Sequence, residues 1–128
     1  MSALLDTHAF LWWVTDSPDL SGPARKIIAD EDNAIFVSAA SAWEIATKVR
    51  LGKLSGVPGV VDRFGELVAA DGFRHLPASY LHALRSGGYG VAQKDPFDRM
   101  LAAQSEIERL PLITRDPAFS LFGIETIW

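Results

Sequence analysis

Four acidic residues occupy positions from which their carboxylates could act together. Asp6 directly follows a short apolar run, and Asp116 comes two residues after Thr114, which ends another apolar run. Glu44 lies about two turns into a predicted helix, and Asp98 lies in the first turn of another. Two carboxylates about 5 Å apart repel each other by about 3 kcal/mol at an effective dielectric constant near 20, so such a cluster needs a cation or bound protons. Ligands that are all oxygen, without His or Cys, suit a hard divalent ion such as Mg²⁺ or Mn²⁺.

Each of these acids also has a local structural explanation. Asp6 and Asp116 can each be the N-cap of the helix or turn that follows, and the segment 95–98 resembles a capping box. Glu44 can pair with Lys48 one helical turn further along the chain. Taken singly, each acid is best explained by such a local role. A shared role depends on a fold that brings all four side chains together.

The residues between the acids alternate between short apolar runs and helical periodicity. This alternation is typical of βαβ units with a mostly parallel sheet, and it predicts one α/β domain over residues 1–128. Ligands bind such sheets at the carboxyl ends of the strands, where Asp6 and Asp116 are expected. The segment 86–90 is predicted to be a flexible loop. We predict strands at 3–5, 34–37, 73–76, 112–114 and 124–128, helices at 7–14, 21–29, 39–51, 60–70, 79–85 and 95–109, and a last helical turn after Asp116.

The composition excludes several classes of site. With no cysteine in 128 residues, the chain can form no disulfide, thiolate zinc site, iron–sulfur cluster or thiol nucleophile. No apolar run reaches the roughly 18 residues of a membrane span, and the N-terminus lacks the basic start of a signal peptide, so we expect a cytoplasmic protein with no membrane partner. The net charge of −4 argues against a broad basic surface for nucleic acid. The four candidate acids account for this excess, because twelve acidic residues then remain against twelve Lys and Arg.

Four short sequence blocks contain the candidate acids. The first is Leu-Leu-Asp-Thr-His at 4–8, and the second is Val-Ser at 37–38 followed by Trp-Glu-Ile at 43–45. The third and most specific is Asp-Pro-Phe-Asp-Arg-Met-Leu-Ala-Ala-Gln at 95–104, and the fourth is Leu-Ile-Thr-Arg-Asp at 112–116. In this order, and over nearly the whole chain, the blocks resemble those of the PIN domain and, within it, of the VapC-type toxins of type II toxin–antitoxin modules.

This resemblance implies a fold, an activity and partners. The implied fold is a PIN-like three-layer α/β/α sandwich around a five-stranded parallel sheet of order 3-2-1-4-5. The implied activity is that of a Mg²⁺-dependent endoribonuclease, with Mn²⁺ as a substitute, which acts as the toxin of a toxin–antitoxin system. The implied partners are a cognate antitoxin, an RNA substrate and a second copy of the chain, with a heterotetramer or larger assembly when the antitoxin is bound.

The resemblance also assigns the site residue by residue. Thr114 matches a hydroxyl residue that supports the last carboxylate, and Thr7 and Ser38 are further supporting residues. Asp95 is a second acid in the third block, and we prefer Asp98 because the Arg-x-Leu-x-Ala pattern continues from it. The hypothesis is hydrolysis of a phosphodiester by a metal-activated water, which leaves a 5′-phosphate and a 3′-hydroxyl. The catalytic and metal-binding residues are predicted to be Asp6, Glu44, Asp98 and Asp116.

Basic residues flank the acids and are candidate RNA contacts. Such side chains position phosphates without reading the base sequence. Because few phosphates would be contacted, the affinity is expected to depend only weakly on salt. A solvated helix face or a surface ion pair is the alternative role for each of them. The main candidates are Lys48, Arg50, Arg99 and Arg115, with Lys53 and Lys94 nearby.

Two other classes of function also place acids at strand ends. An aspartyl-nucleophile phosphatase requires a second Asp two residues after the first, where this chain has His8. A phospho-receiver requires an adjacent acidic pair after the first strand, which Leu5 and Asp6 do not supply. A non-catalytic binding module of the same fold, whose acids are only helix caps, is the second alternative.

Several histidines and tryptophans are predicted to be structural. His8 has no second histidine beside it, so it is left outside the metal-binding set. We expect His82 at the surface or at a strand edge. Trp12 and Trp13 point about 100° apart on a helix, so one is expected in the core and the other at an interface with the antitoxin.

Overall fold

The computed structural model describes all 128 residues as short strands joined by helices. The strands are β1 (Ser2–Leu5), β2 (Ala34–Ser38), β3 (Arg74–Leu76), β4 (Leu112–Ile113) and β5 (Thr126–Ile127). The helices are α1 (Thr7–Val14), α2 (Gly22–Ala29), α3 (Ala39–Arg50), α4 (Phe64–Ala70), α5 (Tyr80–Gly88) and α6 (Pro96–Glu108), with a 3₁₀ helix η1 (Pro117–Phe122). None of the helices combines the length and the apolar character that a membrane crossing requires.

The five strands form a single sheet of order β3-β2-β1-β4-β5, and every neighbouring pair is parallel. The predicted α/β fold with strand order 3-2-1-4-5 is therefore confirmed. In the register of the sheet, Leu5 pairs with Val37 on one side and with Ile113 on the other. The next residues, Asp6, Ser38 and Thr114, consequently lie side by side at the carboxyl edge of the sheet.

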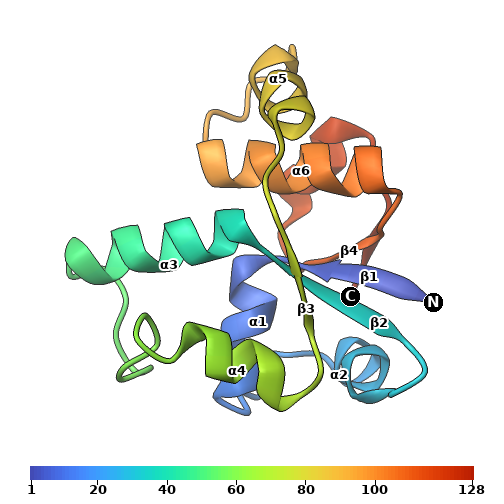
Figure 1. The fold of residues 1–128 in the computed structure, drawn as a ribbon. Coiled ribbons are helices and arrows are strands. Elements are labelled where there is room, and N and C mark those ends of the chain that lie inside the picture. Colours follow the sequence, from blue (N-terminus) through green and yellow to red (C-terminus); the bar gives the residue numbers. More distant parts are fainter.

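Helices cover both faces of the sheet (Figure 1), because the apolar residues of β1 alternate between two cores. Ala3 and Leu5 belong to one core, and Leu4 belongs to the other, as the two-residue period of a strand requires. In Figure 1, α1, α2 and α4 lie below the sheet, and α5 and α6 lie above it. The first core includes Phe10, Ile28 and Val68, and the second includes Leu101, Leu112 and Phe119.

Polar side chains determine where the helices begin. Ser21 accepts a hydrogen bond from the amide of Ala24 at 3.1 Å, and a proline in the first turn of α2 suits the same helix start. Ser38 caps α3 by accepting from the amide of Ala40 at 2.9 Å. The same kind of cap is made by three of the acids discussed above, Asp6, Asp95 and Asp116.

Helix α5 extends further than predicted, because it runs to Gly88 and so includes most of the glycine-rich segment. Each glycine in a helix costs about 1 kcal/mol relative to alanine, which is why the sequence favours a loop. Tertiary contacts with α6 offset this cost, since the Arg85 guanidinium makes two hydrogen bonds to Glu106 and the Tyr89 hydroxyl bonds the same carboxylate. The prediction of a flexible loop at 86–90 is therefore wrong for residues 86–88.

His82 lies in the interior, with 2% of its surface exposed, and not at the surface or a strand edge as predicted. Its Nδ1 accepts a hydrogen bond from the amide of Ser79, and Ser79 in turn caps α5 through the amide of His82. The Nε2 atom lies 3.0 Å from Glu108 Oε1 on α6. The ring therefore joins the start of α5 to the end of α6.

Helix α4 begins at Phe64, four residues later than predicted, because the preceding residues form turns. Gly59 has a φ of +70°, a left-handed conformation that a helix does not contain and that glycine adopts without strain. Strands β4 and β5 are also shorter than predicted, with two residues each.

Candidate active site

Asp6 combines the cap of α1 with a position at the sheet edge. Its Oδ1 accepts a hydrogen bond from the amide of Ala9 at 2.7 Å, so the predicted N-cap is present. The carboxyl group is nevertheless buried, with 6% of the residue exposed. Burial raises the pKa of Asp6, while hydrogen bonds from Thr114 and Ala9 and the charge of His8 oppose the rise. A buried carboxylate of this kind gains stability from a nearby cation.

Thr114 joins the ends of β1 and β4. Its hydroxyl accepts a hydrogen bond from the amide of Asp116 at 3.0 Å, and it also hydrogen bonds to the carboxylate of Asp6. The Asp116 carboxylate caps η1 by accepting from the amide of Ala118 at 2.9 Å, and the residue is exposed. The Thr114 hydroxyl therefore supports two of the candidate acids, Asp6 at its carboxylate and Asp116 at its backbone amide.

Asp98 and Asp95 have different roles at the start of α6. Asp95 is the N-cap, and its Oδ1 accepts from the amides of Phe97 at 2.8 Å and Asp98 at 3.1 Å. The Asp98 carboxylate accepts a hydrogen bond from Gln93 Nε2 at 3.1 Å. Asp95 therefore has the local capping role, and the choice of Asp98 as the site acid stays a prediction.

The pKa of Asp98 shows that the candidate acids share one region. Burial is the largest cause that raises this pKa to about 7, and the negative charges of Asp95, Glu44, Asp116 and Asp6 raise it further. The Glu44 charge also acts on Asp6. The fold thus brings Asp6, Glu44, Asp98 and Asp116 close enough for each to add to the electrostatic field at the site.

Glu44 is buried on α3, with 5% of the residue exposed, and it forms an ion pair with Lys48 one turn along the helix. The pair that local spacing predicted is therefore present. Lys48 is half-buried and supplies a positive charge inside an otherwise acidic region. A buried carboxylate left without such a partner would be strongly destabilising.

Hydroxyl and amide groups hold the surrounding backbone in place. The Thr7 hydroxyl donates to the Ser41 hydroxyl at 3.0 Å and so links α1 to α3. The Ser38 hydroxyl donates to Oε1 of Gln104, and Gln104 Nε2 donates to the carbonyl of Pro77 at 3.2 Å. These bonds join α1 to α3, and they join the ends of β2 and β3 to α6, at the edge where the acids lie.

Sequence reasoning missed two of these residues as parts of the site. Gln104 is fully buried on α6, and its sequence signals are its place at the end of the third block and one amide within the apolar stripe of that helix. Gln93 lies in the connection before α6, where neither periodicity nor a capping pattern marks it. Both are positioning residues, because they contact the acids or the supporting hydroxyls.

The structure does not support Arg99 as an RNA contact. Its guanidinium is half-buried and donates to five backbone carbonyl groups, those of Ser86 and Gly87 in the last turn of α5 and of Tyr89, Val91 and Gln93 in the connection to α6. These bonds hold in place the segment that carries Gln93. The sequence pattern marked a basic residue beside the acids, but its side chain points into the connection and not toward a substrate.

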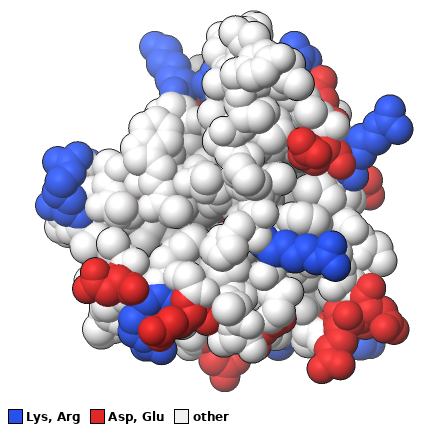
Figure 2. Space-filling view, in the orientation of Figure 1, with Lys and Arg blue, Asp and Glu red and all other residues white.

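The other basic candidates lie at the surface, and they do not merge into one broad patch. Arg50, Lys53, Lys94 and Arg115 are exposed. On the face that Figure 2 shows, acidic and basic side chains are interspersed around the rim, and the centre is mostly uncharged. The predicted absence of a broad basic surface therefore holds on this face.

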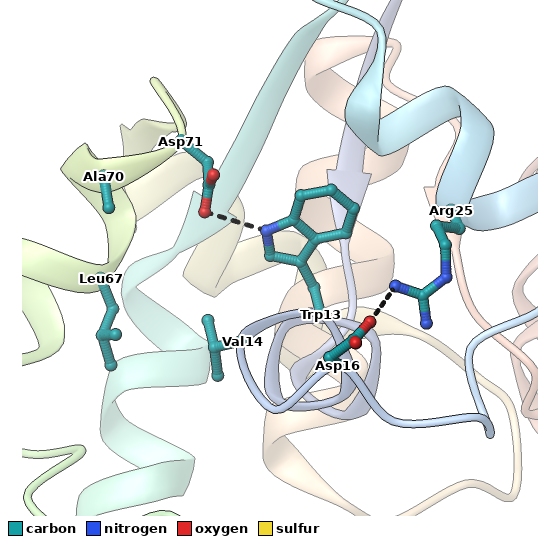
Figure 3. A pocket seen from close by; sticks show the side chains of 7 residues that line it. All are labelled: Trp13, Val14, Asp16, Arg25, Leu67, Ala70 and Asp71. Atoms are coloured by element: carbon teal, nitrogen blue, oxygen red, sulfur yellow. Dashed lines mark hydrogen bonds and ion pairs between the residues drawn. The ribbon is translucent and has the colours of Figure 1, made fainter.

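Trp13 and Trp12 are both half-buried and both pack against the first core, so the expected division into one core tryptophan and one interface tryptophan is not seen. Trp13 stands beside a hollow between α1, α2 and α4, where its Nε1 donates to Asp71 at 3.0 Å (Figure 3). An ion pair between Arg25 and Asp16 closes another side of this hollow. The neighbouring residues Ala9 and Leu11, with Phe10, supply the core face of α1 instead.

The donor atoms at the site fit a hard divalent cation. They are carboxylate and hydroxyl oxygens, and the mutual repulsion of the acids is what such an ion would relieve. No group of three or more His, Asp or Glu side chains is arranged so that it could hold a metal ion on its own. Mg²⁺ does not need one, since it usually keeps several waters and takes one or two carboxylates. The raised pKa values of Asp6 and Asp98, which come first from burial, mean that a cation beside either carboxylate would favour its ionised form.

Comparison with known proteins gives the family. The sequence profile of the PIN domain matches residues 3–124. Ribonuclease VapC16 of Mycobacterium tuberculosis is 56% identical over 36 residues, a match that spans 28% of this chain and only 26% of that protein.

Two solved structures share the fold. VapBC2 from Rickettsia felis, bound to a DNA fragment from its promoter, has a TM-score of 0.70 at 14% identity, with 99% of this chain and 98% of that chain covered. FitAB bound to the IR36 DNA fragment has a TM-score of 0.59 at 20% identity, with coverages of 99% and 94%. Because the profile match extends over nearly the whole chain and the strand order agrees with it, the protein belongs to the PIN domain family.

Proposed function

We propose that this protein is a Mg²⁺-dependent endoribonuclease that acts as the toxin of a type II toxin–antitoxin system. The observation that carries the proposal is that Asp6 and Asp116 line one cleft at the carboxyl edge of the sheet, while the charges of Glu44 and Asp98 act in the same region. Such a cluster at the carboxyl edge of a parallel sheet fits divalent metal and phosphate chemistry. The name of the relative, Ribonuclease VapC16, supports the same reaction class.

In this proposal Asp6 and Asp98 hold the metal, and Glu44 and Asp116 complete the acidic site. Mg²⁺, when bound, would lower the pKa of a coordinated water and offset the negative charge that develops on the phosphoryl oxygens. Thr114 would fix the direction of Asp6, and Gln93 would fix that of Asp98. Mn²⁺ would substitute for Mg²⁺ because it accepts the same oxygen ligands.

The proposed reaction is hydrolysis of an RNA phosphodiester bond by water. Water attacks the phosphorus atom, the bond to the 3′-oxygen breaks, and that oxygen takes up a proton. The products are a 5′-phosphate and a 3′-hydroxyl, so the 2′-hydroxyl takes no part. Lys48, paired with Glu44, is the cation best placed to move toward the phosphate as it enters.

The proposed partners are a cognate antitoxin, the RNA substrate and a second copy of this chain, in the cytoplasm. The support for an antitoxin is the fold shared with the VapBC2 complex and with FitAB over 99% of this chain. A heterotetramer or larger assembly would form when the antitoxin binds. Copurification of a small protein expressed from the neighbouring gene tests this part.

The experiment that tests the proposed activity is RNA cleavage with and without metal. Wild-type protein should cleave RNA in Mg²⁺ and stop in EDTA, and Asp6→Asn should lose at least about 100-fold in rate while remaining folded. Asp62→Asn is the matched control, because Asp62 is exposed and lies outside the acidic site. Full activity in EDTA would contradict the metal requirement. A folded protein that neither cleaves RNA nor responds to Mg²⁺ would instead be a binding module whose acids are helix caps.

A further inference from the structure

A cleft of about 280 Å³ lies directly beside two of the candidate acids, Asp6 and Asp116. Its other walls are formed by His8, Trp12 and Arg115, together with Pro117. The cleft therefore joins the proposed site of phosphate chemistry to a group of flat aromatic and cationic side chains. None of these three side chains has a role in the proposed hydrolysis itself.

The two rings are arranged as one surface by the helix that carries them. His8 and Trp12 are four residues apart on α1, so they lie on the same side of the helix. Their ring centroids are 5.4 Å apart, and the planes are inclined by only 33°. His8 is exposed and Trp12 is half-buried, so the outer part of this surface is open to a ligand.

Contacts from the end of the chain and from the β4–η1 connection fix this surface. Trp128 meets the Trp12 ring edge-on at a centroid distance of 5.8 Å. The Arg115 guanidinium carbon lies 4.5 Å from the Trp12 ring centroid, and the guanidinium approaches Asp19 at 3.8 Å. Because Arg115 immediately precedes Asp116, a group seated on Trp12 and Arg115 is held next to the acids.

We propose that this cleft is a stacking subsite for one unpaired nucleobase of the RNA, adjacent to the scissile phosphate. This inference rests on the proposed ribonuclease function and adds how the substrate is held. Proteins recognise unpaired bases by stacking them on aromatic rings and on arginine guanidinium planes, which are the groups present here. The cleft volume lies just under the roughly 300 Å³ at which pockets begin to enclose drug-sized ligands, so it suits a single base.

The charge of the cleft favours a base over a phosphate. Asp6 and Asp116 line one side, so a free anion there would be repelled, whereas an uncharged base would not. Arg115 can stack on the base with its planar face and still direct N–H groups toward the neighbouring phosphate. Selection would then be for single-stranded RNA with little preference among bases, because every base has a stacking face.

The test is a binding measurement with RNA that lacks one base. Short labelled single-stranded RNAs of mixed sequence, each with one abasic nucleotide at a different position, are titrated with the cleavage-deficient Asp98→Asn protein and followed by fluorescence anisotropy. We expect one position at which loss of the base weakens binding by about 10-fold or more. In proteins that also carry Trp12→Leu or His8→Ala, the same abasic change should have little further effect.

Two controls keep this test decisive. His8→Ala removes an exposed ring and leaves the core intact. This variant therefore still tests the subsite if Trp12→Leu disturbs folding. Tyr80→Leu removes an exposed aromatic side chain on α5, 74% of which is open to solvent, and should leave the abasic penalty unchanged. An abasic penalty that is equal with and without the two rings, or absent at every position, would overturn the subsite.

The result of this binding test can be distinguished from the result of the cleavage test of the proposed function. A protein that cleaves RNA in Mg²⁺ but shows no ring-dependent abasic penalty would retain the function and lose the subsite. If the protein shows the abasic penalty but cleaves no RNA, the cleft is a base-binding site and the proposed ribonuclease function is rejected.

Discussion

Lys48 forms an ion pair with the buried carboxylate of Glu44, one turn away on α3, and so places a cation inside the acidic site. Three further acids, Asp6, Asp98 and Asp116, contribute negative charge to the same region. The ammonium of Lys48 therefore offsets part of the repulsion among these four carboxylates. A bound divalent ion would offset the rest.

Replacing Lys48 by methionine should increase the effect of Mg²⁺ on stability. Breaking a fully buried pair costs about 3–5 kcal/mol, and partial exposure of Lys48 reduces this to about 1–2 kcal/mol. We expect the metal-free Tm to fall by several degrees and the Mg²⁺-induced rise in Tm to exceed that of wild type. Thermal unfolding with and without Mg²⁺ measures both, with Lys26→Met on an exposed position of α2 as control. If Mg²⁺ raised the Tm of wild type and of Lys48→Met by the same amount, Lys48 would not oppose metal binding.

The raised pKa of Asp98 predicts that the metal-free protein loses stability as the pH rises. Its pKa increases from an ordinary value of 3.8 to about 7 on folding, so the folded state holds this proton more tightly than the unfolded state. The resulting stabilisation is complete below pH 3.8 and is lost as the pH rises through about 7. Unfolding measured in EDTA between pH 5 and 8 should therefore show a decline that Asp98→Asn reduces. Mg²⁺ should restore more stability at pH 8 than at pH 5, because the ionised carboxylate binds the metal.

The hydrogen bond from Gln93 to Asp98 predicts a defect in metal affinity. Gln93→Ala removes a group that orients the carboxylate, and loss of such an outer partner typically lowers metal affinity or activity about 10–100-fold. The Mg²⁺ concentration that gives half-maximal cleavage should rise, while the Tm in EDTA changes little. Gln93→Glu should raise the required Mg²⁺ concentration further, since it adds a negative charge beside Asp98. An unchanged Mg²⁺ requirement in both variants would remove Gln93 from the site.

The contacts of Arg99 predict a loss of stability and not a loss of RNA affinity. Arg99→Ala leaves several backbone carbonyl groups of α5 and the α5–α6 connection without a donor, which we expect to cost about 2 kcal/mol or more. Arg99→Lys should restore little of this, because an ammonium cannot reproduce the planar set of donors. Urea unfolding measures the stability, with the exposed Arg50→Ala as the control. If Arg99→Ala unfolds like wild type but has a shallower salt dependence of RNA binding, the residue is an RNA contact after all.

Much of the fold, and the place of the acids within it, follows from local sequence patterns. Asp6 and Thr114 each come directly after a short apolar run, and parallel strands bring such residues to one edge. The caps made by Asp6, Asp95 and Asp116 are equally local, since each bonds amides two or three residues away. These features therefore need no knowledge of distant contacts.

The remaining features depend on contacts between distant segments. Ser38 and Gln104 are 66 residues apart, and only the packing of α6 beside β2 shows that they hydrogen bond. The helical conformation of 86–88 likewise depends on contacts from α6 that override the weak local preference of glycine. The bonds of Arg99 to backbone carbonyls could not be predicted either, because sequence position shows that Arg99 is near the acids but not where its side chain points.

Calorimetric titration of Mg²⁺ into the purified protein tests the central claim most directly, because it measures whether the gathered carboxylates bind a divalent ion. The account predicts saturable binding to wild type and to Asp62→Asn, and at least about 10-fold weaker binding to Asp6→Asn and Asp98→Asn in proteins that remain folded. Equal Mg²⁺ binding by all four proteins, or none by wild type, would contradict the assignment of Asp6 and Asp98 to a metal site.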